Sequence, residues 1–548
     1  MPFFFIITKS FCEFFNSTNK LPLPPKIRTH YIMSQSPEDL FKQVVSHCKE
    51  YGFVFPSSEL YDGLSAVYDY GPRGVALKNN IRAFWWQSMT RLHGNIVGID
   101  SAIFMHPRIW KASGHVDGFS DPMIDNKDSK KRYRADQLIE EYVLKLETKV
   151  QKEITKAQKK WGSDFDSEQF VNTNPKVLRY KAEAKQATDR LNQALEANHL
   201  DAVKALIVEL DIRCPVSGTG NWTDVKQFNL MYSTQMNATE GEDAIYLRPE
   251  TAQGIFVNFL NVQKTARMKI PFGIAQTGKA FRNEIVARQF IMRMKEFEQM
   301  EMQFFVKPGT ELEWFDYWRN YRKLWHLTLG IESHKLRFHK HEKLAHYANA
   351  AEDIEYQFPF GFRELEGIHS RTNFDLSKHQ TYSGKKISYF DPESQSHYVP
   401  YVVETSVGLD RLFLMLMCEC LKTEETHNAE TRTVLALPPE LAPIKLAIMP
   451  LVAKDGLPEL AMNLFNHLKY DIDCFIEEKD SIGKRYRRQD AIGTPFCATI
   501  DHQSLDDHTV TVRYRDSMNQ QRVPMQDLKK LVLEHASIEN LLKKLPAS

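Results

Sequence analysis

The chain has 548 residues, of which 42% are hydrophobic and 26% charged, and its formal net charge is +1. This length exceeds what one hydrophobic core can hold, and it predicts about three or four domains of soluble globular composition. The near-neutral charge excludes nucleic-acid binding driven by overall charge, so any such contact must come from local basic patches. The seven cysteines include no C-x-x-C pair, which argues for a reducing compartment and against a disulfide framework or a ready-made zinc site.

Residues 1–32 differ from the rest of the chain, being Phe-rich, nearly free of acidic residues and closed by a Pro-rich run. Three interpretations stay open. The segment is a secretory signal, although Lys9 breaks its short apolar stretch and no clean cleavage site follows; it is an organelle-targeting leader; or it is a translation-start artefact with Met33 as the true start. We favour the last, and expect residues 1–33 to be disordered or not native. No later segment has the length of a membrane span, so no membrane association is expected.

Two helices are predicted next. The first follows Pro37, where four residues recur at helical spacing: Leu40, Val44, Val45 and Cys48. The second runs from about Val75 to Leu92 and places on one stripe Leu77, Ile81, Phe84 and Trp85. The adjacent Trp85 and Trp86 exceed one stripe, and aromatic rings are enriched at subunit contacts. The second helix is therefore either an ordinary core helix or part of a subunit interface.

Residues 125–210 are typical of a helical insertion. Five apolar residues recur every three or four positions among many Lys and Glu: Ile139, Val143, Leu146, Val150 and Ile154. The stretch 181–210 repeats this character, so a helical hairpin is predicted. Its charges form either a solvated face or a surface that contacts nucleic acid.

The segment from Thr277 to Phe305 predicts two strands joined by a polar loop. In the second strand the side chains alternate, with Phe297, Gln299, Glu301 and Gln303 on one face and Met300, Met302 and Phe304 on the other. The polar face carries an aromatic ring between Arg282 and Arg293, together with several carboxylates. This arrangement favours a charged planar ligand, because Arg offers phosphate a rigid fork of donors. The alternative is a solvated strand face with incidental salt bridges.

The same segment imitates a phosphate-binding loop. Residues 273–279 carry its glycines and lysine, but Ala280 stands where that loop needs Ser or Thr. A strand-like sequence follows, whereas the loop needs a helix N-terminus. We therefore reject this interpretation.

The last third of the chain predicts a strand, a turn and a helix over residues 400–420, and then a separate domain. Cys418 and Cys420 are expected to be helix residues and not metal ligands, because positions i and i+2 do not share a face. Beyond a Pro-rich linker near Pro438, apolar segments alternate as in an α/β domain. This domain holds the densest basic cluster: Lys484, Arg485, Arg487 and Arg488. Tyr486 interleaves it, which suits stacking on single-stranded bases, with a surface helix as the alternative.

Seven motifs, in this order, resemble the class II aminoacyl-tRNA synthetases and especially the homodimeric glycyl-tRNA synthetases: ELYDGLSAVYDYGP, SGHVDGFSDP, RYRAD, LRPETAQGIFVNF, FRNE, ELEGIHSRTNFDL and ETSVGLDR. The resemblance covers roughly Leu40 to Leu545. It implies an α+β fold, with a catalytic domain (34–134 and 211–437) built on an antiparallel sheet flanked by helices. It also implies a helical insertion (135–210) that contacts the tRNA acceptor arm or is merely solvated, and a C-terminal α/β anticodon-binding domain (438–548).

The resemblance also implies the activity. A cytoplasmic homodimer would use ATP and Mg²⁺ to convert glycine to glycyl-adenylate, and would transfer the glycyl group to the 3' end of tRNA(Gly). The rival interpretation is a synthetase-like protein that binds nucleic acid without catalysis. Such descendants are expected to lose the ATP-binding arginines, whereas Arg282, Glu284 and Arg411 are all present here.

Matching positions carry the family's roles onto this chain. The resemblance assigns catalysis to Arg282, Glu284 and Arg411, and ATP binding also to Asn283, Arg293, Met294, Phe297, Glu364, Leu365 and Gly408. It assigns glycine to Arg134, Glu250, Phe297, Gln299, Glu301, Glu404 and Ser406, and tRNA to Lys484, Arg485, Arg487 and Arg488. Thr405 departs from the family, since many relatives carry proline there, which puts the rigidity of this loop in doubt.

Metals are expected only with ATP, as Mg²⁺ that Glu364 could contact, and no site made by protein alone is expected. Some relatives carry cysteine pairs at both roots of the insertion. Here the first root reads DNKDSKK and the second retains only Cys214. The resemblance therefore predicts no structural zinc.

Overall fold

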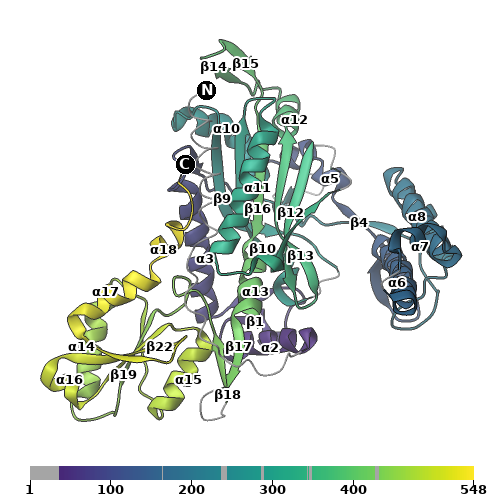
Figure 1. Ribbon diagram of the computed structural model, residues 1–548. Helices are drawn as coiled ribbons and strands as arrows, with labels where there is room; N and C mark the ends of the chain where they lie inside the picture. Colours follow the sequence, from purple (N-terminus) through teal and green to yellow (C-terminus); the bar gives the residue numbers. More distant parts are fainter. Residues whose placement is uncertain are drawn as a thin grey trace. The chain divides into compact units, whose positions relative to one another are not determined.

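The computed structural model describes residues 36–162, 165–235, 244–285, 289–341, 344, 348–425 and 431–547 (Figure 1). The expectation for residues 1–33 lies outside these ranges. The chain forms two compact units. The first unit combines Met1–Ser113, Ser233–Phe281 and Gln289–Ser548, and the second combines Gly114–Tyr232 with Arg282–Arg288. Among the described residues, no helix is both long and apolar enough to cross a membrane.

A seven-stranded sheet is the centre of the first unit. Its strands, in sheet order, are β11 (Leu336–Lys340), β12 (Ala350–Phe358), β13 (Gly361–Thr372), β16 (Tyr401–Gly408), β10 (Glu296–Val306), β9 (Phe272–Phe281) and β3 (Ile96–Gly98). All neighbours are antiparallel except β3 and β9, which are parallel. The predicted antiparallel sheet is confirmed, and β9 begins before the predicted Thr277. Because β9 runs unbroken through residues 273–279, the rejected phosphate-binding loop is indeed a strand.

Helices pack against both faces of this sheet. The helices of the first unit outside its C-terminal domain are α2 (Pro37–Glu50), α3 (Pro72–Thr90), α4 (Pro107–Ala112), α10 (Ala252–Thr265), α11 (Glu311–Thr328), α12 (Phe374–Ser383) and α13 (Leu409–Cys420). Met300, Met302 and Phe304 share one core with α3 and α11, in which the rings of Phe84 and Trp325 stack at 5.0 Å. Alternation along β10 therefore sends its methionines into the core, as predicted.

The two tryptophans of α3 do not form an exposed aromatic surface. Trp85 is fully buried in the core of its own chain, and Trp86 is half-buried against the same core. The pair is therefore explained by packing within the chain. Trp86 is only half-buried, so the alternative that this helix takes part in a subunit interface stays a prediction.

Short antiparallel hairpins complete the first unit outside the C-terminal domain. They pair β1 (Val54–Pro56) with β2 (Tyr68–Tyr70), β7 (Ser233–Gln235) with β8 (Ala244–Tyr246), β14 (Tyr389–Asp391) with β15 (Ser396–Tyr398), and β17 (Leu421–Glu425) with β18 (Thr431–Leu435). Strand β17 follows α13 directly, so one continuous segment leads from the central sheet to the last hairpin.

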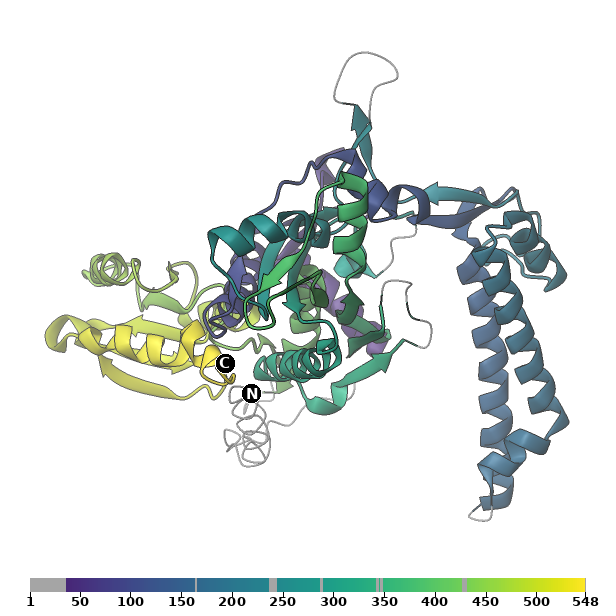
Figure 2. The same cartoon turned by 90° about the horizontal axis from the view of Figure 1, so that it is seen from above.

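The second unit is a long helical hairpin on a small sheet (Figure 2). Its elements are α5 (His115–Gly118), β4 (Ser120–Asn126), β5 (Lys131–Arg134), α6 (Ala135–Trp161), α7 (Ser167–Thr173), α8 (Pro175–Glu196), α9 (Leu200–Glu209) and β6 (Lys226–Asn229). Leu138 and Ile139 of α6 pack against Ala187 and Leu191 of α8, which confirms the predicted hairpin. The compact unit is wider than residues 135–210, because the sheet β5-β4-β6 belongs to it.

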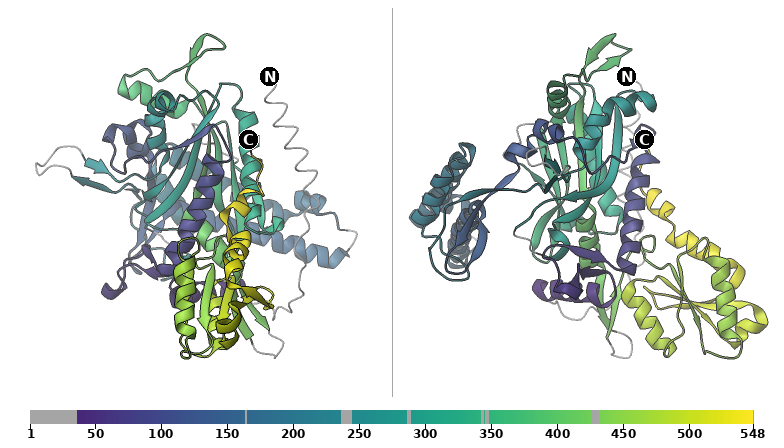
Figure 3. Two further views of the ribbon diagram at one scale, coloured as in Figure 1. Left: turned by 90° about the vertical axis from the view of Figure 1, so that its left-hand side faces the viewer. Right: turned by 180° about the vertical axis from the view of Figure 1, so that it is seen from behind.

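The C-terminal domain is an α/β domain with its own core (Figure 3). Its sheet has the order β20 (Cys474–Ile476), β19 (Leu446–Pro450), β21 (Phe496–Ile500), β22 (Thr509–Tyr514) and β23 (Gln520–Pro524). Its helices are α14 (Leu457–Leu468), α15 (Ile482–Ile492), α16 (His502–Asp507), α17 (Met525–Ala536) and α18 (Ile538–Leu542). Ile448, Leu464 and Val512 lie in the core, so the predicted alternation of strands and helices is confirmed.

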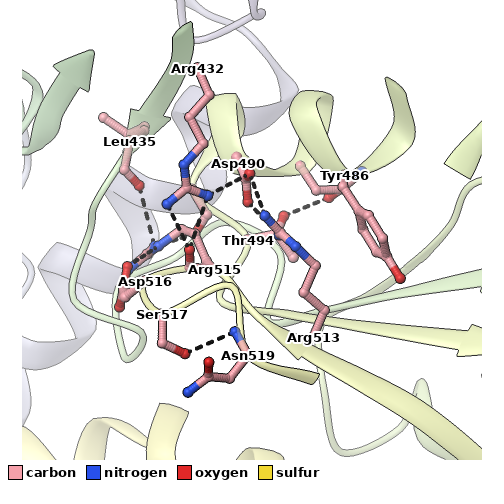
Figure 4. A network of polar contacts seen from close by, with 12 residues as sticks. Arg432, Leu435, Tyr486, Asp490, Thr494, Arg513, Arg515, Asp516, Ser517 and Asn519 are labelled. Carbon is pink, nitrogen blue, oxygen red and sulfur yellow. Dashed lines mark hydrogen bonds and ion pairs between the residues drawn. The ribbon is translucent and has the colours of Figure 1, made fainter. Parts of the chain in front are cut away.

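A buried ionic network ties this domain to the β17–β18 hairpin (Figure 4). Asp490 of α15 accepts from Arg432 Nη1 at 2.9 Å and from both Nη atoms of Arg513 at 2.8 and 2.9 Å. Arg432 also donates to the Arg515 carbonyl at 3.2 Å. Asp490 and the three arginines are almost fully buried. Arg432 also pairs with Glu424 of its own hairpin at 2.7 Å, so two carboxylates balance the guanidinium groups of Arg432 and Arg513 where the two parts of the unit meet.

Replacing Asp490 tests how far this network holds the domain in place. Asp490→Ala leaves Arg513 buried without the carboxylate that it pairs with and leaves Arg432 with Glu424 alone, so the free energy of unfolding should fall by about 3–5 kcal/mol. Urea unfolding measures the change. Asp471→Ala is the control, because the side chains of Lys529 and Asp471 are 43% and 40% exposed and their pair should be worth less than about 1 kcal/mol. Equal effects of the two substitutions would contradict the prediction.

Candidate active site

The polar face of β10 is buried and not solvated. Glu301 lies opposite Ser406 of β16, and Gln303 lies opposite Glu404, so these side chains share one face of the sheet. We call these four residues the carboxyl row. Glu301, Gln303 and Glu404 are only 2%, 0% and 4% exposed. Their burial excludes the alternative of a solvated strand face.

The two glutamates of the carboxyl row share one hydrogen-bond donor. Nε2 of Gln303 donates to Glu301 Oε1 at 2.8 Å and to Glu404 Oε2 at 2.6 Å. On its other side, Glu404 lies 2.8 Å from His369 Nδ1 and accepts from Arg371 Nη1 at 3.1 Å. Glu404 thus has two cationic or polar partners on β13, and Glu301 has none there.

This asymmetry separates the protonation of the two glutamates. Burial, followed by repulsion from Glu404 and Glu250, raises the pKa of Glu301 well above its usual value. Burial also acts on Glu404, but the Arg371 guanidinium and the contact with His369 outweigh it and lower the pKa of Glu404. These surroundings therefore favour a charged Glu404 beside a neutral Glu301. A cation entering the pocket would favour ionisation of both.

The segment that leads into α10 adds further polar groups. Gln253 Nε2 donates to Glu250 Oε1 at 2.9 Å. The Thr251 amide donates to Gln299 Oε1 at 3.2 Å, and the Thr251 hydroxyl donates to Glu301. Hydrogen bonds, register and electrostatic contact thus bring together five of the residues predicted to bind glycine: Glu250, Gln299, Glu301, Glu404 and Ser406.

The start of α13 provides a charged pair on the predicted nucleotide side. Gly408 is the N-cap of α13, and Arg411 in its first turn lies 3.0 Å from Glu364 Oε2. Leu365 and Met294 are buried in the core with 1% and 4% exposure, so only their main chains can face a ligand. The two remaining predicted residues of this side in the first unit are half-buried: Arg293 and Phe297.

Four predicted site residues belong to the second unit: Arg134, Arg282, Asn283 and Glu284. Within this unit, the Arg282 guanidinium lies 5.4 Å from the centre of the Phe119 ring. Arg134 forms ion pairs with Asp136 at 2.6 Å and Asp121 at 3.1 Å. The assigned roles of these four residues stay predictions. Arg134 has its charge already balanced by two aspartates.

The basic cluster of α15 divides into buried and exposed residues. Arg485 is 2% exposed and donates to the carbonyls of Pro450 at 2.6 Å and Leu451 at 3.1 Å. The Tyr486 hydroxyl lies 2.6 Å from Thr499 Oγ1, and its ring is half-buried. Arg485 is therefore not placed to face RNA, because its donors serve the packing of the domain, whereas the expected stacking of Tyr486 on bases stays a prediction.

The other side of α15 presents charge to solvent. Arg488 is engaged by Glu477 and Asp480, each at 2.6 Å. Lys484 and Arg487 are exposed. These two residues are the part of the cluster best placed to meet a phosphate backbone.

The root of the insertion does not fit a zinc ion. Cys214 Sγ lies 3.3 Å from Ser129 Oγ and 3.2 Å from Tyr133 OH, and the Ser217 amide donates to it at 3.5 Å. Structural zinc sites use thiolates and imidazoles, whereas these neighbours offer hydroxyl and amide groups. The absence of structural zinc remains a prediction that the donor set favours.

Sequence reasoning missed three residues that hold the carboxyl row: Thr251, His369 and Arg371. All three stand inside the motifs quoted above, and Arg371 is four residues before Asp375, with which it forms an ion pair at 2.8 Å. His369 and Arg371 are two residues apart in β13, so alternation along a strand would place them on the same face. Only the pairing of β13 with β16, which no local pattern predicts, brings them to Glu404.

Family models match three segments of the chain. The glycyl-tRNA synthetase insertion domain 1 matches residues 121–230, the tRNA synthetase class II core domain (G, H, P, S and T) matches residues 232–419, and the anticodon binding domain matches residues 445–535. Together with the antiparallel sheet, these matches define a class II tRNA synthetase. The chain resembles a solved prolyl-tRNA synthetase from Cryptosporidium parvum complexed with L-proline and AMP, with a TM-score of 0.53, 12% identity and coverage of 94% of this chain and 82% of that one. At that identity the likeness shows the fold alone.

Similarity to curated relatives is much higher. The glycine–tRNA ligase of Chlorobaculum tepidum is 50% identical over 485 residues, which cover 88% of this chain and 97% of that protein. That of Macrococcus caseolyticus is 48% identical over 495 residues, with 90% and 98% coverage, and that of Treponema denticola is 47% identical, with 89% and 95% coverage. The chain belongs to the glycine–tRNA ligase family. The resemblance drawn from the seven motifs is confirmed.

The unequal partners of the two glutamates lead to a paired prediction. Glu404→Gln removes one of the two carboxylates that pair with the buried Arg371, and the one that contacts His369, so the free energy of unfolding should fall by about 3 kcal/mol or more. Glu301→Gln should cost less than about 1 kcal/mol, because an amide resembles the neutral form that its surroundings favour. Thermal or urea unfolding without ligands measures both. A larger loss for Glu301→Gln than for Glu404→Gln would contradict the assignment of charge.

Proposed function

We propose that this chain attaches glycine to tRNA(Gly) in two steps. A glycine carboxylate oxygen attacks the ATP α-phosphorus, the bond to the β-phosphate breaks, and glycyl-adenylate and diphosphate form. A ribose hydroxyl at the 3' end of the tRNA then attacks the glycyl carbonyl and AMP leaves. The observation that carries this proposal is the buried carboxyl row, whose side chains offer carboxyl, amide and hydroxyl groups and no apolar group.

The carboxyl row explains how a pocket can choose the smallest amino acid. One methylene in an apolar pocket is worth only about 1–3 kcal/mol, so contacts alone select glycine poorly. Here Ser406 and the two glutamates occupy the volume in which a side chain would lie. An alanine methyl group would displace their hydration without replacing it. The glycine ammonium would instead meet Glu404, and would favour the ionised form of Glu301.

Phosphoryl transfer needs positioning and charge neutralisation more than a protein nucleophile. Arg411 would contact the γ-phosphate, and the neighbouring Glu364 would contact the Mg²⁺ that ATP carries. Arg282 would stabilise the charge that develops at the α-phosphate, and Phe297 would stack on adenine. Asn283, Glu284 and Arg293 would complete the nucleotide site. These roles follow from the matching positions in the family, and the pairing of Arg411 with Glu364 supports two of them.

The remaining parts of the proposal concern partners and location. The C-terminal domain would bind tRNA through Lys484 and Arg487, and α3 would take part in a homodimer interface. A cytoplasmic location is supported by the described cysteines, since those at 48, 214, 418, 420, 474 and 497 form no disulfide.

Glycine-dependent exchange of diphosphate into ATP tests the first step. The full chain should catalyse exchange with glycine, and far more slowly with alanine or serine. Arg282→Ala should lower exchange about a hundredfold or more, because charge stabilisation at the α-phosphate is lost. Arg179→Ala, at an exposed position of the same unit, is the control and should change little.

Two outcomes would count against this assignment. If Arg282→Ala stayed within a few-fold of the parent, the role of Arg282 would be wrong. If the parent used alanine as well as glycine, the role of the carboxyl row would be wrong. A complete lack of exchange in a folded protein that binds tRNA would instead favour the non-catalytic alternative.

Binding of tRNA tests the division of the basic cluster. Replacing Lys484 and Arg487 together with Ala should weaken tRNA binding and lower the slope of log affinity against log salt by about one to two, because fewer counterions are released. Exchange without tRNA should not change. The matched control replaces Lys530 and Lys543, exposed lysines on other helices of the same domain. Equal losses from both pairs would show a general charge effect and not a binding face.

A further inference from the structure

Three potential metal ligands converge beside the carboxyl row. They are His341, just after β11, Asp353 of β12 and His369 of β13. One ligand atom from each lies within 4.8 Å of the other two. His341 Nε2 is 2.8 Å from Asp353 Oδ2, and the rings of His341 and His369 have their centres 5.9 Å apart. All three side chains keep some contact with solvent, so an ion could enter without unfolding the sheet.

The three potential ligands come from three adjacent strands of the sheet, β11, β12 and β13, with His341 directly after the end of β11. Asp353 pairs with Gly367 of β13, two residues before His369. Gly367 leaves room here, because a Cβ at its position would lie 2.9 Å from His369 Cε1. The His341 amide donates to the Ala351 carbonyl at 3.1 Å, which fixes the chain where it leaves β11. Backbone hydrogen bonds therefore fix the main-chain positions of the three ligand residues.

A contact with Glu404 sets the orientation of the His369 ring. Its Nδ1 lies 2.8 Å from Glu404 Oε1. A neutral imidazole that donates Nδ1–H to a carboxylate keeps its lone pair on Nε2, which is the arrangement found behind metal-bound histidines. Within the described ranges, Nε2 of His369 has no hydrogen-bond partner. The contact with Glu404 therefore leaves Nε2 of His369 available as a ligand.

Charge also favours a cation here. Asp353 and Glu404 lie on either side of His369, and Glu364 contributes further negative charge to the surroundings of Asp353. The neighbouring arginines are engaged elsewhere, since Arg371 binds Asp375 as well as Glu404, and Arg411 pairs with Glu364. The carboxylates of this corner therefore exceed its fixed cations.

We propose that His341, Asp353 and His369 bind one divalent transition-metal ion, such as zinc or cobalt, beside the glycine pocket. Two imidazoles and one carboxylate suit such ions, whereas Mg²⁺ and Ca²⁺ prefer oxygen ligands. A tetrahedral ion with bonds of about 2.0–2.1 Å places its ligands about 3.3 Å apart. Nε2 of His341 and Oδ2 of Asp353 lie 2.8 Å apart and would have to separate slightly. The ligand atom of His369 would have to move closer to them, since the three atoms lie within 4.8 Å of one another. The fourth position would face solvent.

The ion would act as a positioning group for Glu404. It would anchor His369, and His369 would hold Glu404 at the end of the carboxyl row. This role rests on the proposed function, whereas binding of the ion does not. The proposal departs from the expectation that no metal site is made by protein alone.

Cobalt titration of the metal-stripped full chain tests the site without any substrate. Co²⁺ should bind with one equivalent and give a visible ligand-field band typical of nitrogen and oxygen ligands in low coordination. His341→Asn should weaken binding at least about tenfold, because one ligand is lost. His339→Asn is the matched control, since His339 is an exposed histidine on the adjacent strand β11, and it should bind like the parent.

Two results would overturn the proposal. One is a parent protein that binds Co²⁺ no more tightly than His341→Asn. The other is displacement of Co²⁺ by a modest excess of Mg²⁺, which would assign the ion to the oxygen ligands of the nucleotide side. Asp353→Asn keeps a hydrogen-bond acceptor for His341 and should lose cobalt affinity with an unchanged unfolding midpoint, so loss of binding and loss of fold are separated. Since glycine-dependent exchange is measured independently, failure of the metal site leaves the proposed activity standing.

Discussion

A single amide between two buried carboxyl groups is the constraint on which the site depends. Gln303 donates to both Glu301 and Glu404, and it can do so because cross-strand pairing places Glu404 directly opposite it. Two carboxylates this close would repel each other in a buried site. Arg371 and His369 on the next strand stabilise charge on one of them only. The pocket is thereby polarised before any ligand enters.

The opposite face of the same strands carries a second set of buried charges, which fixes the site from beneath. Asp410 accepts from the Glu298 amide at 2.7 Å and pairs with Lys78 of α3 at 2.8 Å. Arg82, also of α3, binds the Glu298 side chain at 2.6 Å. Because Asp410 directly precedes Arg411, these contacts set where the first turn of α13 begins. A buried ionic cluster of this kind adds little net stability, but it defines one register among the strand and the two helices.

Local patterns predicted the parts of the fold that local physics determines. Alternation in β10 was enough to separate its polar face from Met300 and Met302, and helical spacing was enough for α2, α3 and the hairpin of α6 and α8. Pairing between distant strands has no local signal, so the partners of Glu404 on β13 were missed. The basic composition of α15 also led to a wrong expectation for Arg485. Its guanidinium donates to carbonyl groups of the domain and is not available to nucleic acid. The cysteine pattern, finally, bears only on thiolate metal sites and says nothing of His341 and His369.

The ionic network at Asp490 limits how freely this protein could be divided or rebuilt. The C-terminal domain has its own core, which invites treating it as an exchangeable module. Yet Arg432 on the hairpin that continues α13 depends on a carboxylate from that domain, and Arg515 of the domain donates to the Leu435 and Leu437 carbonyls of the hairpin and its exit. Cutting at the Pro-rich segment would separate Arg432 from Asp490 and would separate Arg515 from the carbonyl groups that it binds. A chimera with a foreign anticodon-binding domain would therefore have to include the β17–β18 hairpin that belongs to that domain. The boundary at which the two parts can be exchanged lies between the catalytic domain and this hairpin, and not at the Pro-rich linker.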